Sequence, residues 1–562
     1  MNPDKPLGPV VAVSVGKMSV GISEPSAAET VEVGRLCAVP HEDSNSWLIG
    51  MIDQIRRTPE SSTEGPKVAM MDVTMIGQFI SRDKGGGQFK RGTDAYPRLG
   101  TACFHLDGEH LLKLLQSVNA TFDPQERFEL GTFTLDQSAR ASISGNRFFQ
   151  RHAAVLGSTG SGKSWTVALL LEKASQLKSA NIVLFDLHGE YQPLSDEKTG
   201  FSQRLKIAGP GDLKSPGDDV LFLPYWLLNR DDLFSVIADI RQETAYNQAS
   251  RFARHIFDLK AEWRDENGLD EELASMTMDS PVPFEIDELI ERLEQDNYGM
   301  VPGARSEKKG PWNGLLTKPL ERLRSKVADR RNGFLFQPPD QHLEPDWLQN
   351  FASRLLLAGG DHPGIKVIDL SEVPSDLLPI VVATLARIMY QIQFWTVSED
   401  RLPFCLVCDE AHLYLPRQDQ ADGLQTQALS SFEKIAKEGR KYGVSLLVVS
   451  QRPSDVSTTI LSQCSNMLTL RLTNNLDQGV VRRLLPDGMQ GVYSALPILE
   501  TGEGLLLGDA VALPTRIRLD APNCRPISAT RDFWLDWTKQ SNSEDTIAAA
   551  VAAMRRQSRQ VN

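Results

Sequence analysis

The chain has 562 residues, 41% of them hydrophobic and 24% charged. These are ordinary values for a globular protein, and the length exceeds what one hydrophobic core supports, so two to four domains are expected. The formal net charge of −13 at pH 7 argues against a protein coated in nucleic-acid-binding surface, although it is compatible with a basic channel inside an acidic body.

Residues 1–120 contain short runs of β-branched and apolar residues, separated by clusters of Gly, Pro, Ser and Asp. The runs are residues 10–15, 31–39, 47–55, 68–79 and 99–106. Five or six short strands at this spacing predict a small β-barrel. The basic, glycine-rich segment 82–91 lies between two of the runs. Its two interpretations are a solvated hairpin tip and a contact with nucleic acid or a partner.

A phosphate-binding motif follows the predicted barrel. Residues 157–164 match the pattern G-x-x-x-x-G-K-[ST] in full, between the apolar run 153–156 and a helix-like run at residues 165–177. Glycines let successive backbone N–H groups point at phosphate oxygens, and the N-terminus of the following helix adds a favourable dipole. The predicted nucleotide-binding residues are Gly157, Ser158, Thr159, Gly160, Ser161, Gly162, Lys163, Ser164 and Trp165.

Within this motif we expect Lys163 to reach the β- and γ-phosphates and Ser164 to bind Mg²⁺. The alternative is a Gly/Ser turn that only joins two elements. A second predicted strand, residues 181–185, ends in the polar run 186–191. Because α/β sheets place ligands at the carboxyl ends of their strands, Glu190 is a further candidate nucleotide-binding residue. The alternative is that this polar run only caps the next helix.

Residues 231–360 have apolar side chains at three-to-four spacing and no strong strand, which predicts an inserted helical bundle. Between residues 305 and 331, nine basic residues face three acidic ones, a local charge of 9 − 3 = +6. A solvated helix face and a surface that contacts DNA or a partner are the two interpretations of this segment.

Another predicted apolar strand, residues 404–408, is followed by two carboxylates, Asp409 and Glu410. A buried parallel strand with this ending can present both side chains to a nucleotide. We expect Asp409 to hold Mg²⁺ through water, and Glu410 to orient and polarise the attacking water.

A long predicted helix, residues 423–442, contains Arg440 near its end, and the next strand, residues 444–449, precedes Gln451 and Arg452. The Gln451 amide is expected to hydrogen-bond the attacking water and to report loss of the γ-phosphate. Arg440 or Arg452 is expected to act as an arginine finger. A basic residue near a helix C-terminus also complements the helix dipole, and both roles can coexist at Arg440.

The remaining elements complete the predicted organisation. Strands at residues 365–370, 467–472 and 504–507 complete a sheet of parallel type, and an Ala-rich helix at residues 545–554 is expected to dock on the chain's own body or on a neighbour. The predicted domains are a barrel (1–120), the first and second parts of the core (121–230 and 361–525), the helical insertion (231–360) and a C-terminal bracing segment (526–562).

Four segments are informative in combination: residues 151–164, 185–191, 409–412, and 439–443 with 450–453. Together they resemble the HerA family of DNA translocases, in the FtsK/HerA branch of RecA-like ATPases. The resemblance implies an α/β RecA-like P-loop ATPase core with a parallel sheet, plus the N-terminal barrel and the helical bundle. It also implies ATP and Mg²⁺ as cofactors, Arg440 as a finger that acts in the neighbouring subunit, and Arg151 as a residue that acts across the subunit boundary.

The same resemblance implies a homohexameric ring that moves double-stranded DNA through its pore. The partner would be a nuclease or another effector, in DNA end processing or anti-phage defence. One alternative is a ring scaffold that activates a bound nuclease or NAD-consuming effector, with translocation incidental. Another is an ATPase that couples or packages a substrate at a membrane pore. The N-terminus lacks the shape of a signal peptide and no apolar run approaches a membrane span, which predicts a cytoplasmic protein with no membrane contact.

Overall fold

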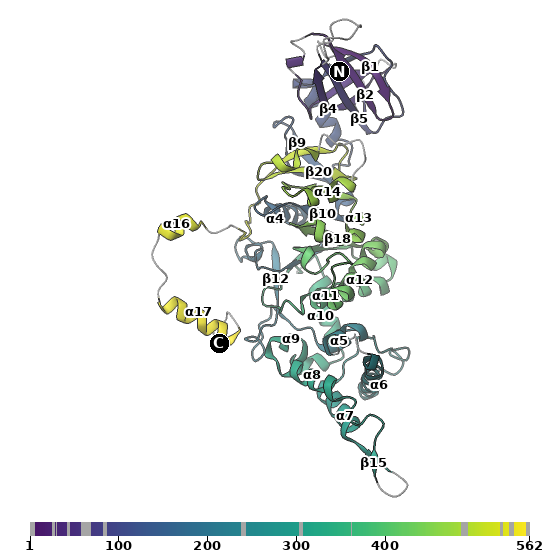
Figure 1. Ribbon diagram of the computed structural model, residues 1–562, viewed down its shortest axis with the longest axis vertical. Coiled ribbons are helices and arrows are strands. Elements are labelled where there is room, and N and C mark those ends of the chain that lie inside the picture. The colour runs from purple at the N-terminus through teal and green to yellow at the C-terminus, as the bar shows by residue number, and fades with distance from the viewer. Residues whose placement is uncertain are drawn as a thin grey trace. The chain divides into compact units, whose positions relative to one another are not determined.

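The structure is a computed structural model that describes residues 6–24, 28–29, 31–41, 45–57, 69–81, 87–237, 243–302, 307–360, 362–484, 493–528, 532–538 and 544–557 (Figure 1). The chain forms two compact units, which are described separately. The first unit is Met1–Ala174 with Ser445–Arg525, and the second is Ser175–Val444 with Pro526–Asn562. The chain therefore crosses between the units three times.

The N-terminal part of the first unit is a closed β-barrel. Its strands are β1 Pro6–Ser14, β2 Lys17–Ile22, β3 Leu36–Pro40, β4 Ser46–Arg57, β5 Ala69–Ser81, β6 Gly87–Arg91 and β7 Ala102–His105. The order β2-β1-β7-β3-β4-β5 closes through antiparallel pairing of β2 with β5, and β6 pairs with the free edge of β5. The predicted barrel is confirmed. However, β6 occupies half of the segment interpreted as a loop, and residues 82–86 lie outside the described part of the chain.

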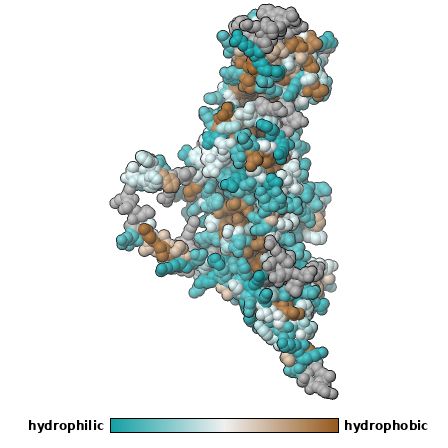
Figure 2. Space-filling model, viewed as in Figure 1, coloured by the Kyte–Doolittle hydropathy of each residue, from teal (hydrophilic) through white to brown (hydrophobic). Residues whose placement is uncertain are grey.

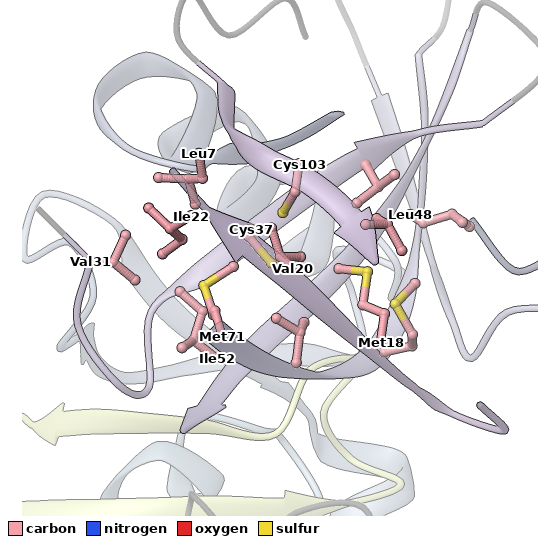
Figure 3. Close-up of a cluster of buried hydrophobic side chains, with 14 of the residues drawn as sticks. Leu7, Met18, Val20, Ile22, Val31, Cys37, Leu48, Ile52, Met71 and Cys103 are labelled. Atoms are coloured by element: carbon pink, nitrogen blue, oxygen red, sulfur yellow. The ribbon is translucent and has the colours of Figure 1, made fainter. Parts of the chain in front are cut away.

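Buried apolar side chains fill the barrel (Figure 3). Val20 and Ile22 lie two residues apart on β2, so both point to the same interior face. They meet Cys37 of β3 and Met71 of β5, and all four side chains are fully buried. Burial of this apolar area, worth about 25 cal/mol per Å², is the main force that closes the sheet on itself.

The rest of the first unit surrounds the phosphate-binding motif. Its strands are β8 Arg127–Phe133, β9 Arg140–Ser144, β10 Ala153–Leu156, β18 Val444–Ser450, β19 Asn466–Thr469, β20 Glu503–Gly508 and β21 Thr515–Leu519, and its helices are α2 Gly108–Asn119, α3 Gly145–Gln150, α4 Lys163–Ser175, α13 Thr458–Gln463 and α14 Asn475–Arg483. The strand order is β18-β10-β19-β20-β21-β8-β9.

The direction of these strands changes partway along the order. β10 is parallel to both β18 and β19, whereas β20, β21, β8 and β9 follow in antiparallel pairs. The predicted strand at residues 504–507 exists, but the prediction that it joins a parallel sheet is wrong. An apolar run indicates burial, and its residues are alike in a parallel and an antiparallel central strand.

The second unit contains a parallel sheet in the order β13-β12-β16-β11-β17. Its strands are β11 Ile182–Asp186, β12 Ser202–Ile207, β13 Val220–Leu221, β16 Ile365–Asp369 and β17 Phe404–Cys408. Every residue of β11, β16 and β17 is buried, as expected of parallel strands covered on both faces. Their register brings Asp186, Asp369 and Cys408 to one edge of the sheet.

A helical bundle lies between β13 and β16 in the chain, as predicted. Its helices are α5 Arg230–Ile237, α6 Glu243–Glu266, α7 Ile286–Tyr298, α8 Thr317–Ala328, α9 Gly333–Phe336 and α10 Trp347–Leu356, with the hairpin β14 Met300–Val301 and β15 Lys308–Lys309 between α7 and α8. Tyr225 is buried at its centre, where the hydroxyl donates to the Phe284 carbonyl at 2.6 Å and the ring stacks on Phe336. These contacts fix the segments that enter and leave the bundle.

The basic segment of the bundle is partly neutralised. Arg324 pairs with Glu294 of α7, and Arg331 pairs with Asp329. Lys318 and Arg322 lie one turn apart on α8 and are exposed. Arg305 lies outside the described residues. Ion pairs within the bundle therefore account for part of the local charge, and the exposed basic residues of α8 are compatible with both interpretations.

Two longer helices follow β16, α11 Leu378–Trp395 and α12 Gly423–Glu438. Among the described residues, α11 is long and apolar enough to cross a membrane by length and composition. The prediction that no apolar run approaches this length is therefore wrong. In this fold 67% of the helix is buried, and Arg387 on it pairs with the buried carboxylate of Asp232 at 2.9 Å, as in the core helix of a globular unit.

The C-terminal tail contains α16 Phe533–Thr538 and α17 Glu544–Arg556. Neither helix has a buried residue. Figure 2 shows hydrophobic side chains at the surface where Figure 1 places α17, which carries the exposed Ile547 and Met554. The described contacts do not show docking of this helix on its own unit, so its docking on a neighbour stays a prediction.

Candidate nucleotide-binding site

The phosphate loop connects β10 to α4 in the first unit. Gly160 and Gly162 have φ of +72° and +100°, and residues other than glycine rarely adopt these backbone angles. A Cβ on Gly157 would lie 2.5 Å from Ser161 Oγ and 2.8 Å from Leu470 Cβ. The glycines of the motif are therefore required by conformation at two positions and by close packing at a third.

Helix α4 begins directly at the end of this loop. Its first residue, Lys163, is 9% exposed, and Thr166 donates from its backbone N–H and its hydroxyl to the Gly162 carbonyl, both at 2.9 Å. The next turn, Val167 to Leu171, is buried. The helix is thus fixed with its N-terminus at the loop, and a helix N-terminus beside a glycine-rich loop is the arrangement that binds phosphate.

Neighbouring strand ends hold the other side of the loop. The Thr159 hydroxyl donates to Gln451 Oε1 at 2.6 Å. The Ser158 N–H donates to the Arg471 carbonyl at 2.8 Å, and the Gly157 N–H donates to the Ser450 carbonyl at 3.2 Å. The structure therefore brings Gln451, predicted from its place after a strand, into direct contact with the phosphate loop.

Arg151 lies at the opposite end of β10, two residues before the strand begins. It forms an ion pair with Asp509, which also lies 4.0 Å from Arg91 of the barrel. The four residues of β10 separate Arg151 from the loop by about 13 Å. The structure does not bring this side chain to the phosphate loop of its own chain, so its role across a subunit boundary stays a prediction.

The carboxylate pair lies in the second unit, directly after β17. Asp409 and Glu410 are 5% and 8% exposed. Glu410 has φ 45° and ψ 42°, the left-handed conformation, which costs a residue other than glycine about 1–3 kcal/mol and is concentrated at functional sites. Its Oε2 lies 3.3 Å from Nδ1 of His412, and the Tyr414 hydroxyl donates to the Asp409 carbonyl at 3.0 Å. Backbone and side chain of Glu410 are therefore both held in place.

The run after β11 is organised by Asp186. Its carboxylate accepts from the N–H groups of His188, Glu190 and Tyr191 at 3.3, 3.1 and 3.0 Å. Burial raises the pKa of Asp186 to about 6, the backbone N–H groups oppose this, and the neighbouring carboxylate of Asp369 adds to it. Asp186 thus supports the fold of this run, whereas the next helix, Gln192–Ser195, has no side-chain cap, and nucleotide binding by Glu190 stays a prediction.

Two charged residues near this run were not predicted. Arg204 on β12 forms an ion pair with Asp369, and this guanidinium holds the pKa of the Asp369 carboxyl below its usual value despite burial. No sequence signal marks the pair, because the two residues lie 165 positions apart and meet only through the strand order.

Glu190 contacts the C-terminal tail, since its backbone carbonyl accepts a hydrogen bond from the Ile527 N–H at 2.7 Å.

Arg440 lies in the 3-10 turn Gly439–Tyr442 that ends α12. It is exposed, and among the described residues its side chain has neither an ion pair nor a hydrogen bond, whereas Arg452 lies 3.7 Å from Asp455. Gly443 ends the turn with φ +74°. Of the two candidate fingers, Arg440 is the one whose guanidinium has no partner among the described residues of its own chain.

The donor atoms suit a magnesium nucleotide. Ser164 in the first unit has a hydroxyl and Asp409 in the second unit has a carboxylate, and Mg²⁺ prefers oxygen ligands of these kinds. Among the described residues, no cluster of three or more His, Cys, Asp or Glu side chains can hold a metal ion by itself.

A profile of the family "Helicase HerA, central domain" matches residues 128–389. A probable helicase of Methanocaldococcus jannaschii is 23% identical over 91% of this chain and 90% of its own length. The DNA double-strand break repair helicase HerA of Pyrococcus furiosus is 24% identical over 74% of this chain and 73% of its own length. Among solved structures, VirB4 of Thermoanaerobacter pseudethanolicus matches 71% of this chain and 98% of its own with a TM-score of 0.46 at 17% identity.

Proposed function

We propose that this P-loop ATPase is a member of the HerA family and hydrolyses ATP to move double-stranded DNA through a homohexameric ring, because the profile of the HerA central domain matches residues 128–389 and helicases are similar to the chain over most of its length. Each subunit would bind ATP with Mg²⁺ at its phosphate loop. The relative in Pyrococcus furiosus bears the name of a DNA double-strand break repair helicase, which supports DNA as the substrate that is moved.

The observation that carries the proposal is the contact between Thr159 of the phosphate loop and Gln451 at the end of β18. A polar amide fixed beside the loop can detect whether a γ-phosphate is present. Thr159 already holds the amide oxygen, so the amide N–H group is directed by the same contact. A turn that merely joins two elements has no need for this arrangement.

Each predicted site residue has a separate proposed role in ATP hydrolysis. Lys163 and the N–H groups of the loop would bind the phosphates; Ser164, and Asp409 through water, would hold Mg²⁺, which would supply charge neutralisation at the phosphates. Glu410, fixed by its backbone conformation and by His412, orients the attacking water and accepts its proton. Arg440 stabilises the transition state of the neighbouring subunit, an effect worth about 10³–10⁵ in rate where such fingers operate.

The biological setting follows from the same proposal. The ring would act in the cytoplasm, away from membranes, with a nuclease or another effector as its partner. The two proposed settings for a ring with such a partner are DNA end processing and anti-phage defence.

The first experiment is steady-state ATP hydrolysis with and without linear duplex DNA, on a sample whose mass is measured by light scattering. A hexamer with DNA-stimulated turnover supports the motor. The Lys163→Ala variant serves as the control, because it removes the phosphate-binding ammonium and should lose turnover. Hydrolysis by the wild-type ring that is indifferent to DNA would contradict translocation and favour a scaffold that activates an effector.

A further inference from the structure

A segment after β21 lies along α4 from its third turn to its first, and we call residues 520–526 the α4 strap. Asn523 donates from its backbone N–H and its side-chain amide to the two carboxylate oxygens of Glu172, at 2.7 and 2.5 Å. The Asp520 N–H donates to the Leu130 carbonyl at 2.9 Å. Asp520 also accepts from Arg140 at 3.1 Å. The strap is therefore held at its start and at its middle.

Arg525 extends from the strap to the phosphate-loop end of α4. Its guanidinium carbon lies 5.3 Å from the centre of the Trp165 ring. Trp165 and Glu172 are seven residues, or two helical turns, apart, so they share one face of α4. The strap runs along this face from Glu172 toward the residue that directly follows Ser164.

Both members of this pair face solvent. Trp165 is 37% exposed, and Arg525 is exposed and forms no ion pair within the described residues. The guanidinium lies over the face of the indole in a cation–π contact, and its outer side is open to solvent because Arg525 is exposed. We call this pair the Trp165–Arg525 layer; a weakly hydrated guanidinium can stack on a further flat group. Such layers are surfaces on which nucleobases stack.

The Trp165–Arg525 layer lies beside the end of the phosphate loop, near the expected place of the nucleotide base. Phosphates bound at the loop, residues 157–164, would leave the ribose and base on the α-phosphate side, toward the first turn of α4. Trp165 is the first side chain beyond the Lys-Ser pair, and Arg525 covers it. The layer thus stands where the base of a loop-bound nucleotide emerges.

We propose that the Trp165–Arg525 layer is the stacking surface for the base of the bound nucleoside triphosphate, a purine because its two rings cover the guanidinium and the indole behind it. The inference rests on the proposed function, since it requires a nucleotide at the phosphate loop. It assigns base binding to residues of one unit, and it adds Arg525, which the motifs do not include.

The test compares ATP with inorganic tripolyphosphate, which has the phosphates and lacks the base. Binding to the full-length chain with Mg²⁺ is measured by calorimetry in the Glu410→Gln background, so that hydrolysis does not interfere. Arg525→Ala should weaken ATP binding about 5- to 150-fold, the range for loss of one stacked base, and should leave tripolyphosphate binding unchanged. Arg482→Ala is the matched control, because Arg482 on α14 is also exposed and has no ion pair among the described residues.

A second variant separates stacking from charge. Arg525→Lys keeps the positive charge and loses the plane, so ATP binding should fall nearly as far as in Arg525→Ala. Full recovery in Arg525→Lys, or equal losses of ATP and tripolyphosphate binding in Arg525→Ala, would overturn the inference and make Arg525 a phosphate contact. Unchanged ATP affinity in Arg525→Ala would also overturn it. If the parent protein binds neither ligand, the proposed nucleotide site itself fails.

Discussion

Gly157→Ala probes whether the phosphate loop is as closely packed as the structure shows. The added methyl group would lie 2.5 Å from Ser161 Oγ and 2.8 Å from Leu470 Cβ, both closer than van der Waals contact. Ser161 is fully buried and the Leu470 Cβ moves only with its backbone, so the loop has to shift. Overpacking of this kind costs about 1–3 kcal/mol.

The two assays are thermal unfolding and calorimetric ATP binding. Each kcal/mol lost should lower the melting temperature of a unit of this size by about 2–4 °C. Displacement of the loop N–H groups should weaken ATP binding by about 5- to 150-fold if the whole cost falls on the bound state. Gly479→Ala is the control, because Gly479 lies inside α14 with nothing within 4 Å of an added Cβ, and it should stabilise by about 0.5–1 kcal/mol.

The outcome that would refute this reasoning is a Gly157→Ala protein with wild-type melting temperature and wild-type ATP affinity. Such a result would mean that the loop is loose enough to absorb a methyl group, and the argument for a preformed phosphate cradle would fail. A fall in melting temperature for Gly479→Ala equal to that for Gly157→Ala would show a general sensitivity of glycines in the first unit, unrelated to the loop.

Three further predictions use the same purified protein. Glu410→Gln should retain ATP, because the amide keeps the size of the side chain, and should stop hydrolysis; loss of ATP binding would disprove the water-orienting role. Arg440→Ala mixed into wild-type rings should lower turnover by more than its mole fraction, and a linear decline would place the finger in its own subunit. The pKa of Asp186 is raised from 3.8 to about 6 in the folded protein, so the native state binds this proton more tightly than the unfolded state does. The stabilisation from Asp186 is therefore full at low pH. It falls by up to roughly 3 kcal/mol of unfolding free energy as pH rises from about 4 to 7. Asp186→Asn should flatten this part of the stability profile relative to wild type, and an unchanged slope in urea titrations would show that Asp186 titrates normally.

The phosphate loop was predictable from sequence because its chemistry is local. Gly160 and Gly162 stand where φ is positive, and the spacing of the motif alone reveals this requirement. The buried strands β11 and β17 were equally clear, since a continuous apolar run followed by acidic residues is typical of a parallel strand that ends at a ligand site. The barrel was predictable as a class, whereas β2 and β6 have mixed sequences and form strands because their neighbours supply hydrogen bonds.

The contacts that complete the site depend on topology and were not predictable in this way. Gln451 meets Thr159 only because β18 pairs with β10. Arg525 lies 360 positions after Trp165 in the sequence, and no periodic pattern relates the two. The left-handed backbone at Glu410 was also hidden, because glutamate rarely adopts it and only the surrounding fold enforces it.

β18 joins two residues with different proposed tasks. Gln451 follows its last residue, and Arg440 precedes its first residue by four positions. All seven residues of the strand are buried, and a backbone of about 23 Å that is already extended cannot lengthen. On the proposed roles, a pull on the backbone of Gln451 when the γ-phosphate leaves would be carried along the strand to the peptide that holds Arg440. The order in which neighbouring subunits hydrolyse ATP would then depend on the mechanical coupling through this one strand.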